Sequence, residues 1–300
     1  MASRTALLLL ESPDWVDYEL LDSGNGARLE RFGPYTFVRP EHQAVWMPAL
    51  PEEHWKSVQG VFHATSEESG GHWEFNKPVE SAWKMQYKGI KFLARTSNSR
   101  HLGVFPEQAS HWDWISSQVR AAKTPLRVLN LFGYTGLATL AAAQAGAQVT
   151  HVDASKKSLS WAKENQDLSG LKDKPIRWII DDALKFVQRE ARRKSVYDGL
   201  ILDPPKFGRG PKGEVWEVFE MFPDLLKACQ AILSPEPCFI VITAYAIRAS
   251  ALSLYYAVDE IMTASPGSLT AGELVVREKS KGRLLSTAIF VRWSAHQVNS

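Results

Sequence analysis

From about Leu126 onward, short apolar runs alternate with helical stretches, and this alternation constrains the fold more than any other feature. Five runs read as strands: Leu126–Phe132, Gln148–Val152, Ile176–Ile180, Gly199–Leu202 and Phe239–Thr243. Helices are expected between them, over Leu137–Ala145, Ser155–Leu168, Ala183–Arg193, Pro223–Leu233 and Ser250–Met262. Glu273–Arg277 and Ser286–Trp293 then read as a closing antiparallel pair. The pattern predicts a doubly wound α/β fold with a seven-stranded, mostly parallel, Rossmann-like sheet.

The first hundred residues read differently, because turn signals interrupt short β-prone runs such as Tyr35–Val38. We expect a β-rich domain over residues 1–100 with a helix near Glu52–Val58, a connecting segment over 101–125 and a catalytic domain over 126–300. The apolar run Leu7–Leu10 is too short to span a membrane and is interpreted as a disordered or docking tail.

Composition narrows the function. The formal net charge of the 300 residues is only +2, so any basic surface for nucleic acid must be local. The two cysteines, Cys229 and Cys238, exclude a disulfide framework and a cysteine-rich zinc site, and the histidines show no metal-ligand spacing, so we expect no metal. A reducing, cytoplasmic setting and no membrane association are expected, and a homodimer is compatible with the sequence. The 11 tryptophans favour core packing over base stacking.

A glycine turn follows the first of these strands. Gly133 permits a close approach of the backbone to a ligand, and Gly136 permits close packing of the next helix, whose first N–H groups suit an anion. Asp153 ends the next strand, 20 residues after Gly133, where a carboxylate can accept both ribose hydroxyls of an adenosine. Only Gly133-x-x-Gly136 of a G-x-G-x-x-G pattern is present, which favours a ligand without phosphates over a dinucleotide.

Two more acidic sites follow later strands. Asp181-Asp182 comes after Ile176–Ile180, and an acid there can accept from an adenine amino group. Asp203-Pro204-Pro205-Lys206-Phe207 comes after Gly199–Leu202, and its prolines fix the loop. The carboxyl ends of parallel strands bind ligands in open α/β sheets, so four sites in this order predict one pocket.

With these motifs, residues 126–293 resemble a class I S-adenosylmethionine-dependent methyltransferase. The likeness is greatest to the bacterial subfamily that includes 23S ribosomal RNA methyltransferases acting at cytosine C5 and guanine N7. The resemblance rests on Phe105–Gln108, Asn130–Gly136, Val152–Ser155, Asp181–Ala183 and Asp203–Phe207. It implies an N-terminal substrate-recognition domain and S-adenosylmethionine as cofactor.

The resemblance also implies residue roles. Phe132, Gly133, Tyr134 and Gly136 would hold the methionine part of the cofactor, Asp153 its ribose and Asp182 its adenine. The full set implied for cofactor binding is Gln108, Asn130, Phe132, Gly133, Tyr134, Thr135, Gly136, Asp153, Ala154, Asp181, Asp182 and Ala183. The residues implied for the catalytic face, where the target base would meet the methyl group, are Asp203, Pro204, Lys206 and Phe207.

The sequence favours a ring nitrogen over other methyl acceptors. Methylation at a pyrimidine C5 uses an attacking cysteine, and related C5 enzymes carry a Thr-Cys pair after the fifth strand, where this chain has Thr243-Ala244-Tyr245. Amino-nitrogen enzymes place an aromatic residue directly after Asp-Pro-Pro, whereas Lys206 stands there and Phe207 follows. A ring nitrogen such as guanine N7 needs only positioning.

Local cations favour RNA, ribosomal RNA in particular, as the substrate. Basic stretches occur at Lys84–Arg100, Arg189–Lys194, Lys206–Lys212 and Lys279–Arg283. Charge runs usually mark solvated faces, but the run from Lys206 to Lys212 is the strongest candidate because it adjoins the predicted active site. A nicotinamide-dependent oxidoreductase and a non-catalytic RNA-binding protein that keeps the fold are the alternatives.

Overall fold

A computed structural model describes residues 6–65, 70–245 and 247–295. These form two compact units, each with its own core. The first unit comprises residues 6–10, 110–274 and 287–295, and the second comprises 11–109 and 275–286. This division differs from the expected one, because the expected connecting segment is split between the units and residues 275–286 join the N-terminal part of the chain.

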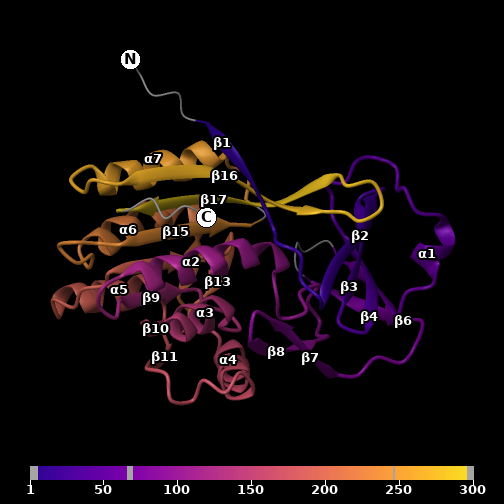
Figure 1. Ribbon diagram of the computed structural model, residues 1–300, viewed down its shortest axis with the longest axis horizontal. Coiled ribbons are helices and arrows are strands. Elements are labelled where there is room, and N and C mark those ends of the chain that lie inside the picture. The colour runs from indigo at the N-terminus through magenta and orange to yellow at the C-terminus, as the bar shows by residue number, and fades with distance from the viewer. Residues whose placement is uncertain (1–5, 66–69, 246, 296–300) are drawn as a thin grey trace. The chain divides into compact units, whose positions relative to one another are not determined.

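An eight-stranded sheet forms the centre of the first unit (Figure 1). In sheet order its strands are β1 (Leu7–Glu11), β16 (Ser268–Arg277), β17 (Leu284–Ser294), β15 (Phe239–Ala244), β12 (Gly199–Leu202), β9 (Arg127–Leu131), β10 (Gln148–Asp153) and β11 (Ile176–Ile180). The last five are parallel to one another, and β17 is antiparallel to β15. The doubly wound, mostly parallel sheet expected from the apolar runs is confirmed.

The eighth strand corrects the interpretation of Leu7–Leu10 as a disordered or docking tail. These residues lie in β1, at the edge of the sheet beside β16. Gly272 in β16 makes the close approach possible, since a Cβ at that position would lie 1.8 Å from the carbonyl oxygen of Leu8. A run this short gains its structure from the partner strand, and no local signal announces that partner.

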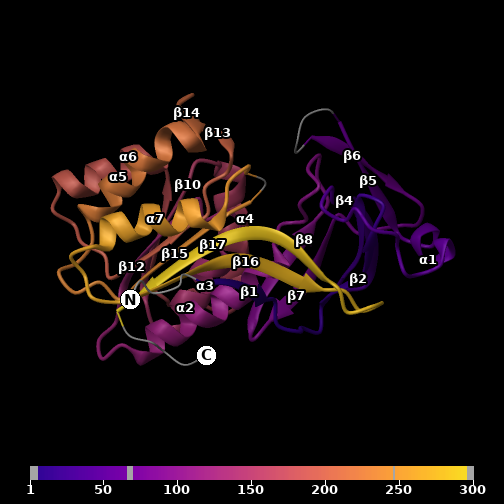
Figure 2. The ribbon, with the colours of Figure 1, turned by 90° about the horizontal axis from the view of Figure 1, so that it is seen from above.

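Helices cover both faces of the sheet (Figure 2). On one face, α5 (Ala183–Arg192), α6 (Val218–Gln230) and α7 (Ala251–Met262) bury the largest apolar cluster. On the other face, α2 (Ala109–Ala121) and α3 (Leu137–Ala145) pack over β9 and β10, with α4 (Lys156–Leu168) beside α3. The Ser155 hydroxyl caps α4 by accepting from the Ser158 N–H, and Gly146 ends α3 with φ 116°. Helix α2 was not expected.

The second unit is rich in β-structure, as expected. A five-stranded sheet runs β2 (Tyr18–Gly24), β3 (Ala27–Phe32), β4 (Tyr35–Pro40), β5 (Gly60–Ala64) and β6 (Gly71–Phe75), and a ribbon pairs β7 (Ala82–Tyr87) with β8 (Ile90–Arg95). The expected helix is α1 (Glu52–Lys56). Aromatic side chains fill the core, among them Trp15, Phe32, Phe37 and Trp83, each less than 9% exposed. Tryptophan here serves packing, as composition suggested.

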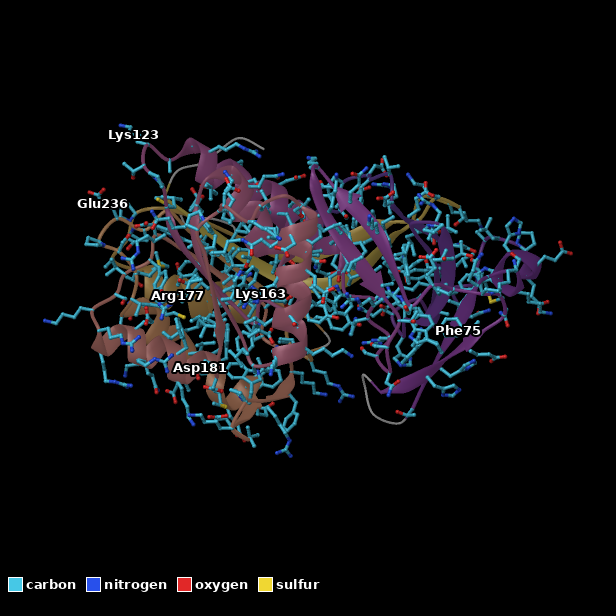
Figure 3. All side chains as sticks on the ribbon, turned by 90° about the horizontal axis from the view of Figure 1, so that it is seen from below. Phe75, Lys123, Lys163, Arg177, Asp181 and Glu236 are labelled. Carbon is cyan, nitrogen blue, oxygen red and sulfur yellow. The ribbon has the colours of Figure 1, made fainter. Side chains whose placement is uncertain are left out.

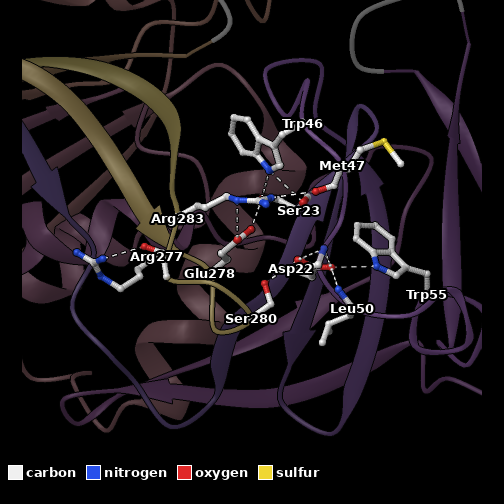
Figure 4. A network of polar contacts seen from close by, with 12 residues as sticks. Asp22, Ser23, Trp46, Met47, Leu50, Trp55, Arg277, Glu278, Ser280 and Arg283 are labelled. Carbon is white, nitrogen blue, oxygen red and sulfur yellow. Dashed lines mark hydrogen bonds and ion pairs between the residues drawn. The ribbon is translucent and has the colours of Figure 1, made fainter.

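Residues 275–286 are fastened to β2 by a buried carboxylate (Figure 4). Asp22 is fully buried and accepts hydrogen bonds from the Ser280 hydroxyl at 2.6 Å, the Leu50 N–H at 2.7 Å and the Trp55 indole at 3.2 Å. Burial alone would raise the pKa of Asp22, but these donors lower it. The carboxylate therefore stays ionised and satisfied, which explains why this segment belongs with the N-terminal unit.

Within residues 6–65, 70–245 and 247–295, no helix has both the length and the hydropathy needed to span a bilayer. In the same residues, no three His, Cys, Asp or Glu side chains lie close enough together to hold a metal ion.

Candidate functional site

The order of the parallel strands creates a switch point between β9 and β12. From β9 the chain runs to β10 and β11 on one side, and it then returns to β12 on the other side. Leu131 at the end of β9 is in register with Val152 of β10 and with Leu202 of β12. The strand ends are therefore level, and ligands bind at this place in open α/β sheets. The predicted sites in the first unit lie at or next to the carboxyl ends of β9, β10, β11 and β12.

Strained backbone marks the turn after β9. Phe132 has φ 57° and Tyr134 has φ 50°, values in the left-handed region that non-glycine residues seldom adopt. Such strain persists only where the surrounding structure enforces it, and it clusters at binding sites. The turn is held at three points: the Gly133 N–H donates to the Val152 carbonyl at 3.1 Å, the Asn165 amide donates to the Thr135 carbonyl at 2.9 Å, and the Tyr134 N–H donates to Asp153.

Asp153 joins this turn to the start of α4. One carboxylate oxygen accepts from the Tyr134 N–H at 2.8 Å, and the other accepts from the Ser155 N–H at 2.7 Å. Burial raises the pKa of Asp153, although both N–H groups act in the lowering direction. An ionised carboxylate can accept about four hydrogen bonds, so each oxygen retains capacity for a ribose hydroxyl. The geometry fits the predicted ribose role.

The N-terminus of α3 fits the charged end of the same ligand. Gly136 precedes α3 with φ 85°, and no side chain among the described residues caps this helix. Uncapped N–H groups at a helix N-terminus favour a carboxylate. The donor set of the turn, the carboxylate of Asp153 and this helix end together suit an adenosyl group that carries an amino acid.

A buried histidine lies directly beneath the turn. His151 is fully buried, its Nδ1 lies 2.9 Å from the Thr139 hydroxyl, and its ring lies 4.6 Å from that of Trp178. Burial lowers the pKa of His151 to about 3, so the ring is neutral at physiological pH. A Cβ at Gly133 would lie 2.3 Å from His151 Cε1. The sequence analysis assigned Gly133 to a close approach of the backbone to a ligand and did not identify His151 as a neighbour that leaves no room for a side chain.

We expect Gly133→Ala to lower the free energy of unfolding by about 1–3 kcal/mol, because the added methyl group overpacks a ring that cannot retreat. Urea denaturation of the parent and the variant measures this change. The matched test adds His151→Ala, which removes the obstructing ring. The double variant should then lose less stability than the sum of the two single variants. Additive losses would contradict the assigned contact.

Asp181 and Asp182 follow β11 at the carboxyl end of the parallel strands, and both already accept hydrogen bonds from α5. Asp182 is 5% exposed and caps α5 by accepting from the Lys185 N–H at 2.9 Å. Asp181 accepts a 2.5 Å bond from Arg189 and lies beyond the end of β11 (Figure 3). Ala183 is buried in the core cluster, and Ala154 is half-buried beside Asp153. The adenine role of Asp182 stays a prediction.

Asn130 and Gln108 lie elsewhere than in the turn. Asn130 is 2% exposed, and its amide donates to the Thr139 hydroxyl at 2.9 Å, so it supports the turn from within the sheet. Gln108 lies in the 3-10 helix Pro106–Gln108 of the second unit. Contact of either residue with the cofactor stays a prediction.

The Asp-Pro-Pro loop after β12 is followed by a hairpin that the sequence did not predict. Strand β13 (Phe207–Arg209) pairs with β14 (Val215–Glu217) where a basic loop was expected. Trp216, 3% exposed, donates from its indole N–H to the Pro205 carbonyl at 2.7 Å, and its ring lies 4.9 Å from that of Phe132. Trp216 thus connects the loop that carries Asp203 to the turn after β9, so the two loops are fixed relative to one another.

Neither cysteine lies at the carboxyl edge of the sheet. Cys229 is fully buried within α6, and burial raises its pKa to about 12. Cys238 directly precedes β15, at the opposite end of the parallel strands, and burial together with Asp198 and Glu236 raises its pKa. Tyr245 packs against the cluster of Leu274 and Phe290. A thiolate nucleophile is therefore not available at this edge among the described residues.

Several cations of the expected basic patches form ion pairs or hydrogen bonds with other residues of the protein. Lys279 pairs with Asp14 at 2.8 Å, Arg283 donates to the Met47 carbonyl at 3.0 Å, and Arg193 pairs with Glu190. In the β7–β8 ribbon, Lys84, Lys91 and Arg95 share the face opposite the buried aromatic residues. The segment from Lys206 to Lys212 forms part of the β13–β14 hairpin.

Comparison with known proteins agrees with this architecture. Residues 36–248 match the family described as S-adenosylmethionine-dependent methyltransferase. The crystal structure of a SAM-dependent methyltransferase from Agrobacterium tumefaciens is 50% identical, with a TM-score of 0.91 over 96% of this chain and 94% of that one.

Two curated relatives match over parts of their length. Ribosomal RNA large subunit methyltransferase K/L of Shewanella sp. strain ANA-3 is 41% identical over 113 residues, which are 37% of this chain and 16% of the relative. Ribosomal RNA large subunit methyltransferase I of Aeromonas salmonicida is 28% identical over 152 residues, half of this chain and 37% of the relative. The chain thus spans well under half of either relative. The family match covers most of the chain and the strand order agrees with it, so the chain belongs to the S-adenosylmethionine-dependent methyltransferase family.

Proposed function

We propose that this protein transfers a methyl group from S-adenosylmethionine to a ring nitrogen of an RNA base. The observation that carries the proposal is the level edge of β9, β10 and β12, where the strained turn, Asp153 and Asp203 follow adjacent strands. One side of this edge suits the adenosyl and amino-acid parts of the cofactor. The Asp203 loop would present the acceptor on the other side.

The chain's own residues would act by binding, orientation and exclusion of water. When bound, S-adenosylmethionine supplies an electrophilic methyl group on a sulfonium sulfur. A ring nitrogen such as guanine N7 would accept this methyl group through its lone pair, and the demethylated cofactor would leave as a neutral sulfide while the base takes up the positive charge. No proton is removed, so the protein needs no general base and acts mainly through alignment. Asp203, Pro204, Lys206 and Phe207 would form the acceptor side.

The cysteines favour nitrogen over a pyrimidine C5, because attack on the ring requires a thiolate beside the base. Cys229 is in the core, and Cys238 is at the opposite edge of the sheet. RNA as the substrate is supported by the ribosomal RNA methyltransferases that match half or less of this chain and by the exposed cations of the hairpin after Asp203.

We expect a variant with Cys229→Ala and Cys238→Ser to transfer methyl groups at the parent's rate within about twofold, since neither thiol would take part in the reaction. Transfer from labelled S-adenosylmethionine into RNA measures this rate. Thermal unfolding serves as a control, because Cys229 packs in the core. Loss of transfer in a folded double variant would instead support cysteine-dependent methylation at a pyrimidine C5.

The proposed function itself is tested with ribosomal RNA from cells that lack this gene. The purified protein should transfer labelled methyl groups to that RNA, and nucleoside mass spectrometry should locate the mark on a base nitrogen. Calorimetry should show binding of S-adenosylmethionine and of its demethylated product, and no binding of NAD. Transfer to protein only, or NAD binding, would refute the proposal.

A further inference from the structure

The β13–β14 hairpin exposes one face of mixed aromatic, apolar and basic character. Phe207 and Arg209 share one face of β13, and their direct partners in β14, Glu217 and Val215, lie on the same face. Phe207 is 56% exposed, Val215 is 51% exposed, and Arg209 is also exposed. The other face carries Trp216, which is buried. A hairpin could bury its apolar side chains, so two exposed together require an explanation.

Both acids of this hairpin are held by groups other than its own cations, so neither pairs with Arg209 or Lys212. Glu214 pairs with Lys185 of α5 at 2.8 Å and also accepts from the Lys212 N–H at 2.8 Å. The hydrogen bond from Lys185, together with these N–H groups, lowers the pKa of Glu214 to about 2. Glu217 accepts from the Glu220 N–H and so caps α6. Arg209 and Lys212 have no acidic partner among the described residues.

The same contacts hold the hairpin in one position. Lys185 fixes its tip through Glu214, Trp216 fixes it to the Pro205 carbonyl, and the Val218 N–H donates to the Lys206 carbonyl at 3.0 Å. The exposed face is thus preorganised directly after the loop that carries Asp203. Preorganised surfaces lose less conformational entropy on binding.

We propose that this face, formed by Phe207, Arg209 and Val215, binds unpaired nucleotides that flank the target base, so that the substrate is a single-stranded RNA segment. The inference rests on the proposed function. Aromatic and guanidinium planes stack on bases whose faces are open, and Arg209 can also meet a phosphate. In a duplex, the base faces are covered by neighbouring base pairs and cannot stack on Phe207.

Fluorescence anisotropy of the protein saturated with S-adenosylhomocysteine tests the proposal. The probes are a single-stranded RNA of about 12 nucleotides and the same strand annealed to its complement. The parent should bind the single strand more tightly. A variant with Arg209→Gln and Val215→Ser should bind it about tenfold more weakly. The slope of log affinity against log salt should fall by about 0.7, as expected for the loss of one contact to a single-stranded phosphate.

Matched controls exchange an exposed cation and an exposed aromatic elsewhere in the first unit, Lys227→Gln in α6 and Tyr256→Ser in α7. These should bind like the parent. Equal binding of the duplex by the parent, or unchanged single-strand affinity in the hairpin variant, overturns the inference. If the parent still methylates RNA in that case, the proposed function stands. If the parent methylates no RNA, the proposed function fails independently of the hairpin.

Discussion

Replacing Asp153 with alanine should weaken binding of S-adenosylhomocysteine by about a hundredfold to ten-thousandfold. The ribose hydroxyls of the ligand would lose two hydrogen bonds to the carboxylate. Each hydrogen bond to a charged group contributes about 1.5–3 kcal/mol. The variant also leaves the N–H groups of Tyr134 and Ser155 without their acceptor, which loosens the turn. Isothermal titration calorimetry with S-adenosylhomocysteine measures the loss.

Two further variants test whether the loss of affinity is specific to the Asp153 carboxylate. Asp153→Asn keeps the shape and one acceptor oxygen, so its loss of affinity should be smaller. Asp167→Ala removes a carboxylate from the far end of α4, where it pairs with Lys172, and should bind like the parent. Circular dichroism checks that each variant is folded. Parent-like affinity in a folded Asp153→Ala protein would refute the assignment of the cofactor pocket.

Protonation of the Asp153 carboxyl group should make the affinity for the cofactor depend on pH. Because burial raises the pKa of Asp153, its carboxylate is protonated at a higher pH than that of an ordinary aspartate. A protonated carboxyl accepts hydroxyl hydrogen bonds poorly, so affinity for the cofactor should fall as the pH drops through the raised value. In Asp153→Asn this part of the pH dependence should be absent.

The sequence predicts this edge well because each acid directly follows a short apolar strand. Asp153, Asp181 and Asp203 were assigned to strand ends from local patterns alone, and parallel pairing then brings such ends together. Apolar runs and strand ends depend only on residues that are neighbours in the chain, so they can be recognised from the sequence alone. The doubly wound sheet follows from the same signals.

The features that were missed depend on distant partners. Strand β1 is ordered by β16, which lies more than 250 residues away in the sequence. The strands of the hairpin after Asp203 have three residues each, and β13 contains Gly208, so neither strand carries a clear periodicity. His151, Asn165 and Trp216 brace the turn and the Asp203 loop from other elements. A histidine inside an apolar strand is a weak signal for function. Its effect becomes visible only in the structure, where the His151 ring leaves no room for a Cβ at Gly133.

Replacing Asp203 with alanine should lower the rate of methyl transfer by about 100- to 1,000-fold, the usual effect of removing one preorganised polar group from a reacting centre. Asp203 follows Leu202, whose register with Leu131 sets it beside the turn after β9. Pro204 is buried, and Trp216 holds the Pro205 carbonyl, so the loop is rigid at the point where the acceptor would lie. Single-turnover transfer from labelled S-adenosylmethionine to RNA gives the rate.

The Asp203 variant differs from the Asp153 variant in what it spares. Affinity for S-adenosylhomocysteine should change by less than about threefold, because Asp203 is assigned to the acceptor side and contributes to alignment in the transition state. Asp224→Ala, an exposed acid in α6, is the matched control and should react like the parent. If Asp203→Ala instead lost cofactor affinity and kept its single-turnover rate at saturation, the roles assigned to the two sides of the site would have to be exchanged. The cofactor would then lie against β12, and Asp153 would face the RNA.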